Sequence, residues 1–343
     1  MRGMGTGVCR ADAEGGRRCS HHQKGSNLAR HNARRRRNRA MKAGIIQWAR
    51  DNGVSSAEVV QLQQMGPRAA KDWANQQGLD PEMFAPAVPI GEPLPSSWAT
   101  TSWMTPRLAE QISTVRAHQG RHPAERALLQ GAVVDHVSAP GGTNTTNRVE
   151  LDNGQVGYHK SFDGLNNALA REFGHGSAQQ GIHEVAAWQL ARRLGPPWSQ
   201  IVPPCVLREV EGELGSFALE RPGLPIGGAG RSPVWQQAAF FDSLIGQQDR
   251  HRGNFLMDGD RITLIDHGYT FARLGDPCNE SGLQGGRGPS PLSDSEVDAL
   301  NRLLDSPDTL GLAGILEPDR LDALISRAKL MRKHKIILPP GSY

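Results

Sequence analysis

The stretch Asp249–Phe271, D-R-H-R-G-N-F-L-M-D-G-D-R-I-T-L-I-D-H-G-Y-T-F, decides how the rest of the chain is interpreted. Asp249 and Asn254 stand five residues apart, and a β-hairpin with its turn at Asp258–Asp260 is predicted to follow them. The return strand ends at Asp266. Neighbouring loops therefore receive two carboxylates and one amide, which are the acid and oxygen ligands that phosphoryl transfer to a hydroxyl requires.

A second interpretation of this stretch is an ordinary acidic hairpin, because Asn and Asp are common turn formers. A lone D-x-x-x-x-N would favour that interpretation. Here a hairpin of suitable length separates the two acidic loops, from Asp249 to Asp266. The full string favours a phosphate-transfer site.

The order D-x-x-x-x-N, hairpin, D-x-G resembles the catalytic loop and metal-binding loop of the protein-kinase-like superfamily. The sharper form, D-R-H-x-x-N followed by I-D-H-G, resembles the phosphatidylinositol 3-/4-kinase branch and its small bacterial relatives, with the HipA-like kinases more distant. The resemblance covers roughly residues 130–335. It implies an α+β, two-lobed protein-kinase-like fold, with a β-rich N-lobe that contains one key helix and a mainly helical, minimal C-lobe.

The resemblance also implies roles for individual residues of the stretch. Asp266 and Asn254 would bind Mg²⁺ beside the phosphates of ATP. Asp249 would orient the attacking hydroxyl or accept its proton. His251 is a second candidate base, because an ordinary histidine pKa of about 6.5 suits that task. Arg250 is assigned to contact phosphate or the metal-binding loop.

The chain takes on a β character from Gly131, upstream of this site. A strand begins at Val133, a polar turn follows over residues 138–146, and a strand over residues 156–160 ends at Lys160. In the resembled family such a turn covers the phosphates and the lysine reaches the α- and β-phosphates, although this turn lacks G-x-G-x-x-G. An ordinary exposed strand lysine is the alternative for Lys160. The turn residues assigned to phosphate binding are Ser138, Gly141, Gly142 and Thr143.

A helix that ends before Gly195 is predicted downstream of Lys160. Its apolar residues recur every four positions, at Ile182, Ala186, Leu190 and Leu194. Glu184 lies among them, where a carboxylate usually needs a partner. The resemblance implies an ion pair with Lys160 that orients the lysine. A carboxylate that merely favours the positive end of the helix is the alternative.

A hairpin around Glu211-Gly212 is predicted from two strands over residues 203–208 and 214–220. In the resembled family this second strand precedes the hinge between the lobes, where backbone groups hold adenine. Leu219 and Glu220 are therefore assigned to nucleotide binding.

The remaining elements of the C-lobe are expected to be helices. They are predicted from Ser232 to about Ile245, over residues 294–304 and over residues 318–334. Gln247-Gln248 stand where relatives of the resembled branch carry an Asn, and this difference concerns loop geometry rather than the metal ligands.

Charge is distributed unevenly along the chain. Residues 1–42 contain 12 Lys/Arg against Asp12 and Glu14, although the net charge of all 343 residues is only +4. Residues 1–40 are predicted to be a disordered basic tail. Such an arm can bind nucleic acid or acidic lipid, or can be no more than a solvated tail, and both interpretations stay open.

The N-terminal part also contains residues of zinc-ligand type, Cys9, Cys19, His21 and His22. Their spacing fits no closed zinc site, so incidental residues are favoured. The predicted organisation is a tail (1–40), a small helical module (41–80), a linker with helices (81–125), the N-lobe (126–222) and the C-lobe (223–343).

Composition excludes several classes of protein. No apolar run approaches the roughly 20 residues of a membrane span, so no transmembrane segment is expected. The N-terminus lacks the apolar core of a signal peptide, which predicts a cytoplasmic location. The 4 Cys in a chain of this length do not form a disulfide framework.

Together these features predict an ATP- and Mg²⁺-dependent kinase that transfers the γ-phosphoryl group to a hydroxyl of a protein or small molecule. An inositol lipid is less favoured, because no basic amphipathic helix adjoins the catalytic region. Two alternatives remain. One is transfer of AMP on the same fold, and the other is a kinase-like scaffold whose basic arm, residues 1–42, binds nucleic acid.

Deletion of residues 1–42 tests the nucleic-acid interpretation. If the arm binds, the full chain binds DNA with an affinity that falls steeply with salt, because each neutralised phosphate releases counterions, and the truncated chain loses this binding. The measurement is a DNA titration at low and at physiological salt. Equal binding by both chains, or binding by neither, contradicts the interpretation.

Overall fold

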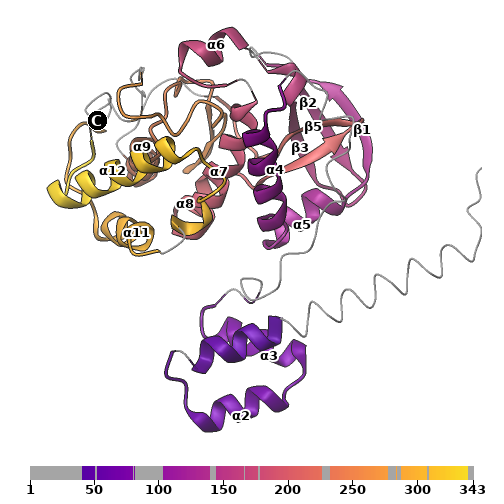
Figure 1. The fold of residues 1–343 in the computed structure, drawn as a ribbon, viewed down its shortest axis with the longest axis vertical. Helices are drawn as coiled ribbons and strands as arrows, with labels where there is room; N and C mark the ends of the chain where they lie inside the picture. The colour runs from indigo at the N-terminus through magenta and orange to yellow at the C-terminus, as the bar shows by residue number, and fades with distance from the viewer. Residues whose placement is uncertain are drawn as a thin grey trace, which may run out of the picture. The chain divides into compact units, whose positions relative to one another are not determined.

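The computed structural model describes residues 41–50, 52–79, 81, 103–139, 144–165, 167–176, 178–225, 232–276, 283, 287–306 and 309–338 (Figure 1). The chain divides into two compact units, residues 1–86 and 87–343, and each is described by itself. The finer boundaries inferred from the sequence stay predictions. The basic tail and the four zinc-type residues in it lie outside the described residues.

Among its described residues, the first unit has three short helices, in the stretch predicted to be a small helical module. A helix over residues 41–50 precedes α2 (Ser56–Gln64) and α3 (Pro67–Gln76). Ser55 caps α2, because its hydroxyl accepts a hydrogen bond from the backbone N–H of Glu58. These helices have an apolar core of their own, composed of Met41, Ile45, Ala49, Val59, Leu62, Ala70 and Ala74.

The second unit begins with two helices and an antiparallel sheet. The helices are α4 (Pro106–His118), within the predicted linker with helices, and α5 (Pro123–Gln130), which extends beyond it. The five strands are β1 (Val133–Ser138), β2 (Thr146–Leu151), β3 (Val156–Ser161), β4 (Cys205–Val210) and β5 (Glu213–Leu219). Their order in the sheet is β1-β2-β3-β5-β4, so β3, which carries Lys160, lies in the middle.

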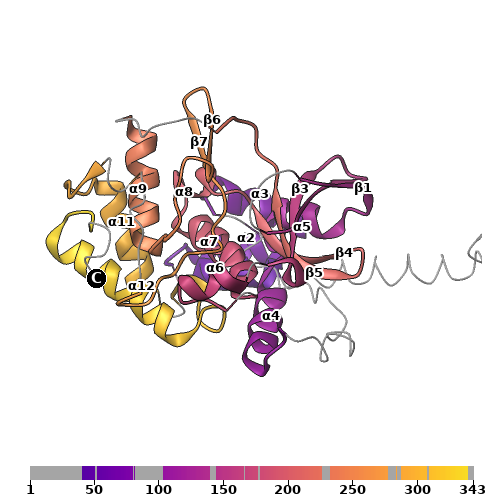
Figure 2. The same ribbon diagram turned by 90° about the horizontal axis from the view of Figure 1, so that it is seen from above.

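Helix α7 (Gln179–Leu194) is the central helix of this unit. Every residue from Gln180 to Ala191 is buried, because α7 packs on β4 and β5 on one side and on α4, α8 (Trp198–Ile201) and α11 (Asp294–Leu304) on others. Figures 1 and 2 show it between the sheet and the helices of the C-terminal part. The helix stops at Gly195, whose φ of 77° few other residues adopt.

Alternation along β4 divides the apolar side chains between two cores. Cys205 and Leu207 belong to the large core around α7, whereas Val206 and Val210 pack with Leu128 of α5 in a smaller one. Successive side chains of a strand point to opposite faces, so β4 is covered on both sides.

The C-terminal part is mainly helical. It contains α9 (Pro233–Ile245), α11, α12 (Pro318–His334) and the hairpin β6 (Phe255–Asp258) and β7 (Arg261–Leu264). The predicted class, α+β with a β-rich first part, one key helix and a mainly helical second part, is confirmed. Four short elements have no counterpart among the predictions: η3 (Phe162–Gly164), α6 (Asn167–Glu172), α8 and η4 (Thr309–Gly311). They are too short to give a periodic pattern in the sequence.

Among the described residues, no helix has both the length and the apolar character that a bilayer span requires. The cytoplasmic location stays a prediction.

Gly215 on β5 is expected to be essential for the close approach of β3. A Cβ at this position would lie 2.2 Å from the backbone carbonyl oxygen of Lys160. We expect Gly215→Ala to lower the free energy of unfolding by about 1–3 kcal/mol, because the backbone must shift to relieve the overlap. Urea denaturation measures the change.

Gly176→Ala is the matched control, because its Cβ would meet only the Gln179 side chain at an ordinary 3.5 Å. Equal stabilities of the Gly215 and Gly176 variants would contradict the close packing of β3 and β5.

Candidate functional site

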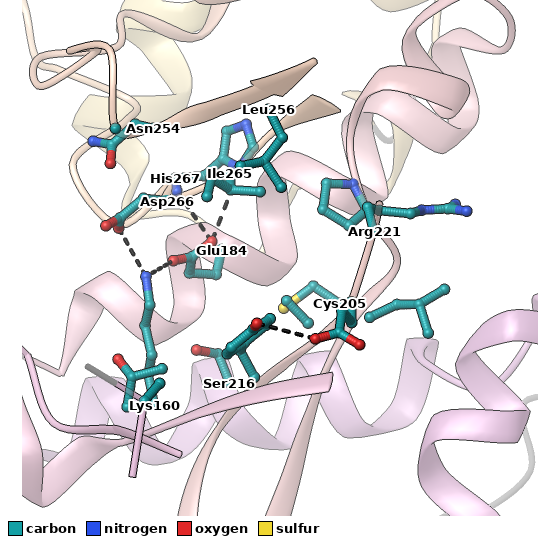
Figure 3. A pocket seen from close by; sticks show the side chains of 18 of the residues that line it. Lys160, Glu184, Cys205, Ser216, Arg221, Asn254, Leu256, Ile265, Asp266 and His267 are labelled. Atoms are coloured by element: carbon teal, nitrogen blue, oxygen red, sulfur yellow. Dashed lines mark hydrogen bonds and ion pairs between the residues drawn. The ribbon is translucent and has the colours of Figure 1, made fainter. Parts of the chain in front are cut away.

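A cavity of ≈ 1140 Å³ lies between the sheet and the loops around the β6–β7 hairpin (Figure 3). This volume is sufficient for a nucleotide-sized ligand. The sequence-assigned residues that line it are Lys160, Glu184, Leu219, Glu220, Asp249, His251, Asn254 and Asp266. Segments more than 100 residues apart in the sequence thus meet in one place.

One face of the sheet forms a wall of the cavity. Thr146, Lys160 and Ser216 are cross-strand neighbours, and the adjacent row contains Tyr158 and Ala218. All five line the cavity. Residues two apart on a strand share a face, so the position of Lys160 also places Tyr158 in the cavity.

The Lys160 ammonium joins the sheet, the central helix and the loop after β7. Its Nζ lies 2.7 Å from Glu184 Oε1 and 2.8 Å from Asp266 Oδ1 (Figure 3). Burial alone would lower the pKa of Lys160, but the carboxylates of Asp266 and Glu184 outweigh it and raise that pKa above its ordinary value. The Lys160–Glu184 pair implied by the resemblance is present.

Glu184 also holds the loop that carries Asp266. Its second oxygen, Oε2, accepts a hydrogen bond of 3.0 Å from the backbone N–H of His267. Asp266 itself has a φ of 59°, in the left-handed region that Asp tolerates better than most residues. Burial favours its neutral form, but Lys160 outweighs burial and the pKa of Asp266 is lowered. The carboxylate is therefore ionised at neutral pH.

The loop from Asp249 to Asn254 is fixed by its own backbone and by Gln247. Asn254 Nδ2 donates to the carbonyl oxygen of Asp249 at 2.7 Å. Gln247 Oε1 accepts from the backbone N–H of Asp249 at 3.0 Å, and its Nε2 donates to the carbonyl oxygen of Asp266 at 3.3 Å. Gln247, which stands where an Asn is expected, thus connects the two acidic loops.

The candidate bases Asp249 and His251 both line the cavity. Burial is the main cause that raises the pKa of Asp249, so its carboxylate is a stronger base than an exposed aspartate. The His251 ring is exposed, and its Nδ1 accepts a hydrogen bond from the backbone N–H of Gly253 at 3.0 Å.

Arg250, assigned from the sequence to contact phosphate or the metal-binding loop, does not lie where a catalytic residue would. Its side chain is buried and does not line the cavity; Nε lies 3.0 Å from Asp242 Oδ2, and both side chains are fully buried. Nη1 donates to the carbonyl oxygens of Asn254 and Ile265. Arg250 therefore contacts the metal-binding loop, one of its two assigned partners, from behind, and it does not face the space where phosphate would bind.

The residues assigned to Mg²⁺, Asn254 and Asp266, provide oxygen donors at the end of the cavity near Lys160. Because Asn254 donates through Nδ2, its Oδ1 stays available as an acceptor, and Figure 3 shows it beside Asp266. Within the described residues, no three His, Cys, Asp or Glu side chains form a metal-binding group. Mg²⁺ typically takes one or two protein oxygens and completes its coordination with phosphates and water, so this donor set fits it.

Leu219 and Glu220, which the resemblance assigns to the hinge, already make hydrogen bonds within the protein. The N–H of Leu219 donates to Pro204 and that of Glu220 to Val156, at 2.8 and 2.9 Å. The Glu220 carboxylate accepts hydrogen bonds from Arg148, at 2.8 and 3.0 Å.

Tyr158 also donates a hydrogen bond to the Glu220 carboxylate, at 3.0 Å. Leu219 and Glu220 line the cavity, but their backbone N–H groups are hydrogen-bonded within the protein and are not available to an adenine ring. Their assignment to nucleotide binding stays a prediction.

The assigned phosphate-binding turn is only partly described. Gly141, Gly142 and Thr143 lie outside the described residues. Ser138 is exposed at the end of β1 and does not line the cavity, whereas its neighbour Ala139 does.

Several lining residues were not assigned from the sequence. They include Tyr158, Cys205, Ser216, Leu256, Ile265 and Tyr269. Strand alternation from Lys160 could have identified Tyr158. The contributions of β4 and β5 depend on strand order, which no local pattern indicates.

No known protein-family model matches this chain, and no curated protein matches it in sequence. Among solved structures, it is similar to the Golgi casein kinase with Mn and ADP bound, at 14% identity and a TM-score of 0.42, over 71% of this chain and 82% of that one. It is also similar to the Helicobacter pylori proinflammatory kinase CtkA, at 13% identity and a TM-score of 0.35, over 60% and 93%. These likenesses are weak, so we base the function on the residues of this chain.

The buried Arg250–Asp242 pair is expected to be essential for stability. Asp242→Asn leaves a guanidinium buried without its counter-charge, and we expect the free energy of unfolding to fall by about 3–5 kcal/mol. Urea denaturation measures it. Asp258→Asn, an exposed change on β6, is the control and should alter stability by less than about 0.5 kcal/mol. Similar small effects of both changes would contradict a structural role for the pair.

Proposed function

We propose that this protein is an ATP-dependent kinase that transfers the γ-phosphoryl group of ATP to a hydroxyl of a protein or small molecule. The observation that carries this proposal is the position of the Lys160 ammonium, between the carboxylates of Glu184 and Asp266. The same cavity contains Asp249 and Asn254. A cation for phosphate, a carboxylate base for the attacking hydroxyl and two oxygen ligands for a metal are the parts that this reaction needs.

The two ends of the cavity differ in chemistry, and this difference supports one orientation of the nucleotide. Cys205, Leu256 and Ile265 provide apolar surface between two charged regions, with Lys160, Glu184 and Asp266 on one side and Arg221 on the other (Figure 3). An aromatic base favours the apolar part and phosphates favour the ammonium. Burial raises the pKa of the Cys205 thiol well above its ordinary value, so this cysteine acts as apolar surface.

The transfer step follows from the positions of the acidic groups. The acceptor oxygen forms a bond to the γ-phosphorus, and the bond from that phosphorus to the β–γ bridging oxygen breaks. The acceptor proton passes to Asp249, whose raised pKa suits this role, and ADP leaves with the bridging oxygen. His251, exposed beside Asp249, is the second candidate base.

Asp266 and Asn254 would hold the metal ion. Mg²⁺ would neutralise charge on the phosphates when bound. The ionised state of Asp266, which Lys160 stabilises, prepares this carboxylate for a cation. Lys160 is expected to exchange part of its contact with Asp266 for phosphate oxygens.

Incubation with γ-labelled and α-labelled ATP tests the proposal without a known acceptor. We expect the γ label to appear in inorganic phosphate or in the protein itself, with the α label remaining in ADP. Transfer of the α label to protein would indicate AMP transfer, and no turnover of either label would contradict an enzymatic function. Adding candidate acceptors then separates protein, small-molecule and inositol-lipid hydroxyls.

Asp266→Asn is expected to reduce Mg²⁺-dependent ATP turnover by at least about 100-fold, because an ionised metal ligand is lost. Melting temperature should show that the variant remains folded. Asp260→Asn, at the exposed turn of the hairpin, is the matched control and should keep wild-type turnover. Unchanged turnover in the Asp266 variant would exclude this site as the catalytic centre.

A further inference from the structure

Tyr269 has a buried hydroxyl that has no partner in the described structure. It follows Asp266 by three residues, its side chain is 4% exposed, and it lines the cavity. Its Oη is a buried atom without a hydrogen-bond partner among the described residues. Buried hydroxyls are normally hydrogen-bonded, so this one indicates a partner that binds in the cavity.

The Tyr269 ring cannot easily turn away to find another partner. It packs against Phe173 and His175, with ring centroids 5.0 and 5.8 Å away. Its carbonyl oxygen accepts a hydrogen bond of 2.9 Å from the backbone N–H of Gln248, beside Asp249. Packing and backbone together fix the ring at the wall of the cavity, near the carboxylates of Asp249 and Asp266.

The charges around this hydroxyl indicate what it can bind. Burial, and then the carboxylates of Asp266 and Asp249, raise the pKa of Tyr269 to about 12. A phenol is protonated at neutral pH even without such a shift, so its O–H is available as a donor. Neither carboxylate is a hydrogen-bond partner of the hydroxyl. A ligand oxygen that carries negative charge is the partner that suits it.

We propose that Tyr269 is a further catalytic residue, whose hydroxyl donates a hydrogen bond to a non-bridging oxygen of the phosphoryl group in transfer. This inference rests on the proposed kinase function. A bond to the attacking hydroxyl is disfavoured, because donation to that oxygen would withdraw the electron pair that must attack phosphorus. Fixed donors aimed at an oxygen that gains charge are effective in catalysis because they need no reorganisation.

Tyr269→Phe removes the donor and keeps the ring. Hydrolysis of Mg-ATP without an acceptor is the assay, followed as release of γ-labelled phosphate. We expect kcat to fall about 10- to 100-fold and KM for ATP to rise by no more than about 10-fold, because the hydrogen bond to the γ-phosphoryl group is made in part to bound ATP. A hydrolysis rate equal to that of wild type overturns the inference. Wild-type protein that neither releases γ-phosphate nor transfers it to itself overturns the kinase proposal as well, so the two failures are distinguishable.

Nucleotide binding gives a second readout that does not depend on turnover. Tyr269→Phe should bind Mg-ADP within about two-fold of wild type and should bind a non-hydrolysable analogue with a γ-phosphate about 3- to 10-fold more weakly. Calorimetric titration measures both, and it also shows that the variant is folded. Equal weakening of both ligands overturns the inference, because it indicates general distortion of the site.

Tyr158→Phe is the matched comparison, since it removes a phenol from the same cavity at the hinge end. There the hydroxyl already donates to Glu220. We expect this change to act on nucleotide affinity and KM, with kcat within about three-fold of wild type. An equal fall of kcat in both variants overturns the specific placement of Tyr269 at the phosphoryl group.

Discussion

The two oxygens of Glu184 hold the candidate site together. One binds the Lys160 ammonium and the other binds the backbone N–H of His267. A buried carboxylate is stable only when both oxygens have partners, so this side chain constrains the sheet and the loop after β7 at the same time. Helix α7 (Gln179–Leu194) provides the rigid support, because it is buried along almost all its length. The position of Asp266 depends on this contact.

Buried arginines that do not line the cavity fix the loops of the C-terminal part. Arg250 binds two carbonyl oxygens that flank the hairpin, Arg320 binds the carbonyl of Phe271, and Arg327 binds that of Ala272. Irregular backbone has carbonyl groups that no sheet or helix satisfies, and guanidinium groups supply several donors each. The chain around Asp266 is therefore held in one conformation without regular secondary structure. This explains how a left-handed Asp266 is tolerated.

Much of the local structure could be predicted from the sequence. Periodicity gave the helices over residues 294–304 and 318–334, and alternation with turn residues gave the strands around Lys160. The direction of Arg250 could not be predicted, because the motif next to Asp249 says nothing about the buried Asp242 behind it. In the sequence, Gln247 is only a departure from the resembled pattern. In the structure, its side chain links the loop of Asp249 to the loop of Asp266.

By itself the sequence determined which chemistry is available: an acid, an amide and a second acid around a hairpin, with a lysine and a glutamate upstream. Only the tertiary structure decided that these groups converge, that Lys160 lies between Glu184 and Asp266, and that the Tyr269 hydroxyl is left without a partner in the described cavity. The physical reason is the distance along the chain over which each effect acts. Backbone propensities act over a few residues, whereas burial and charge pairing join groups that are distant in the chain and depend on how β3, α7 and the hairpin pack.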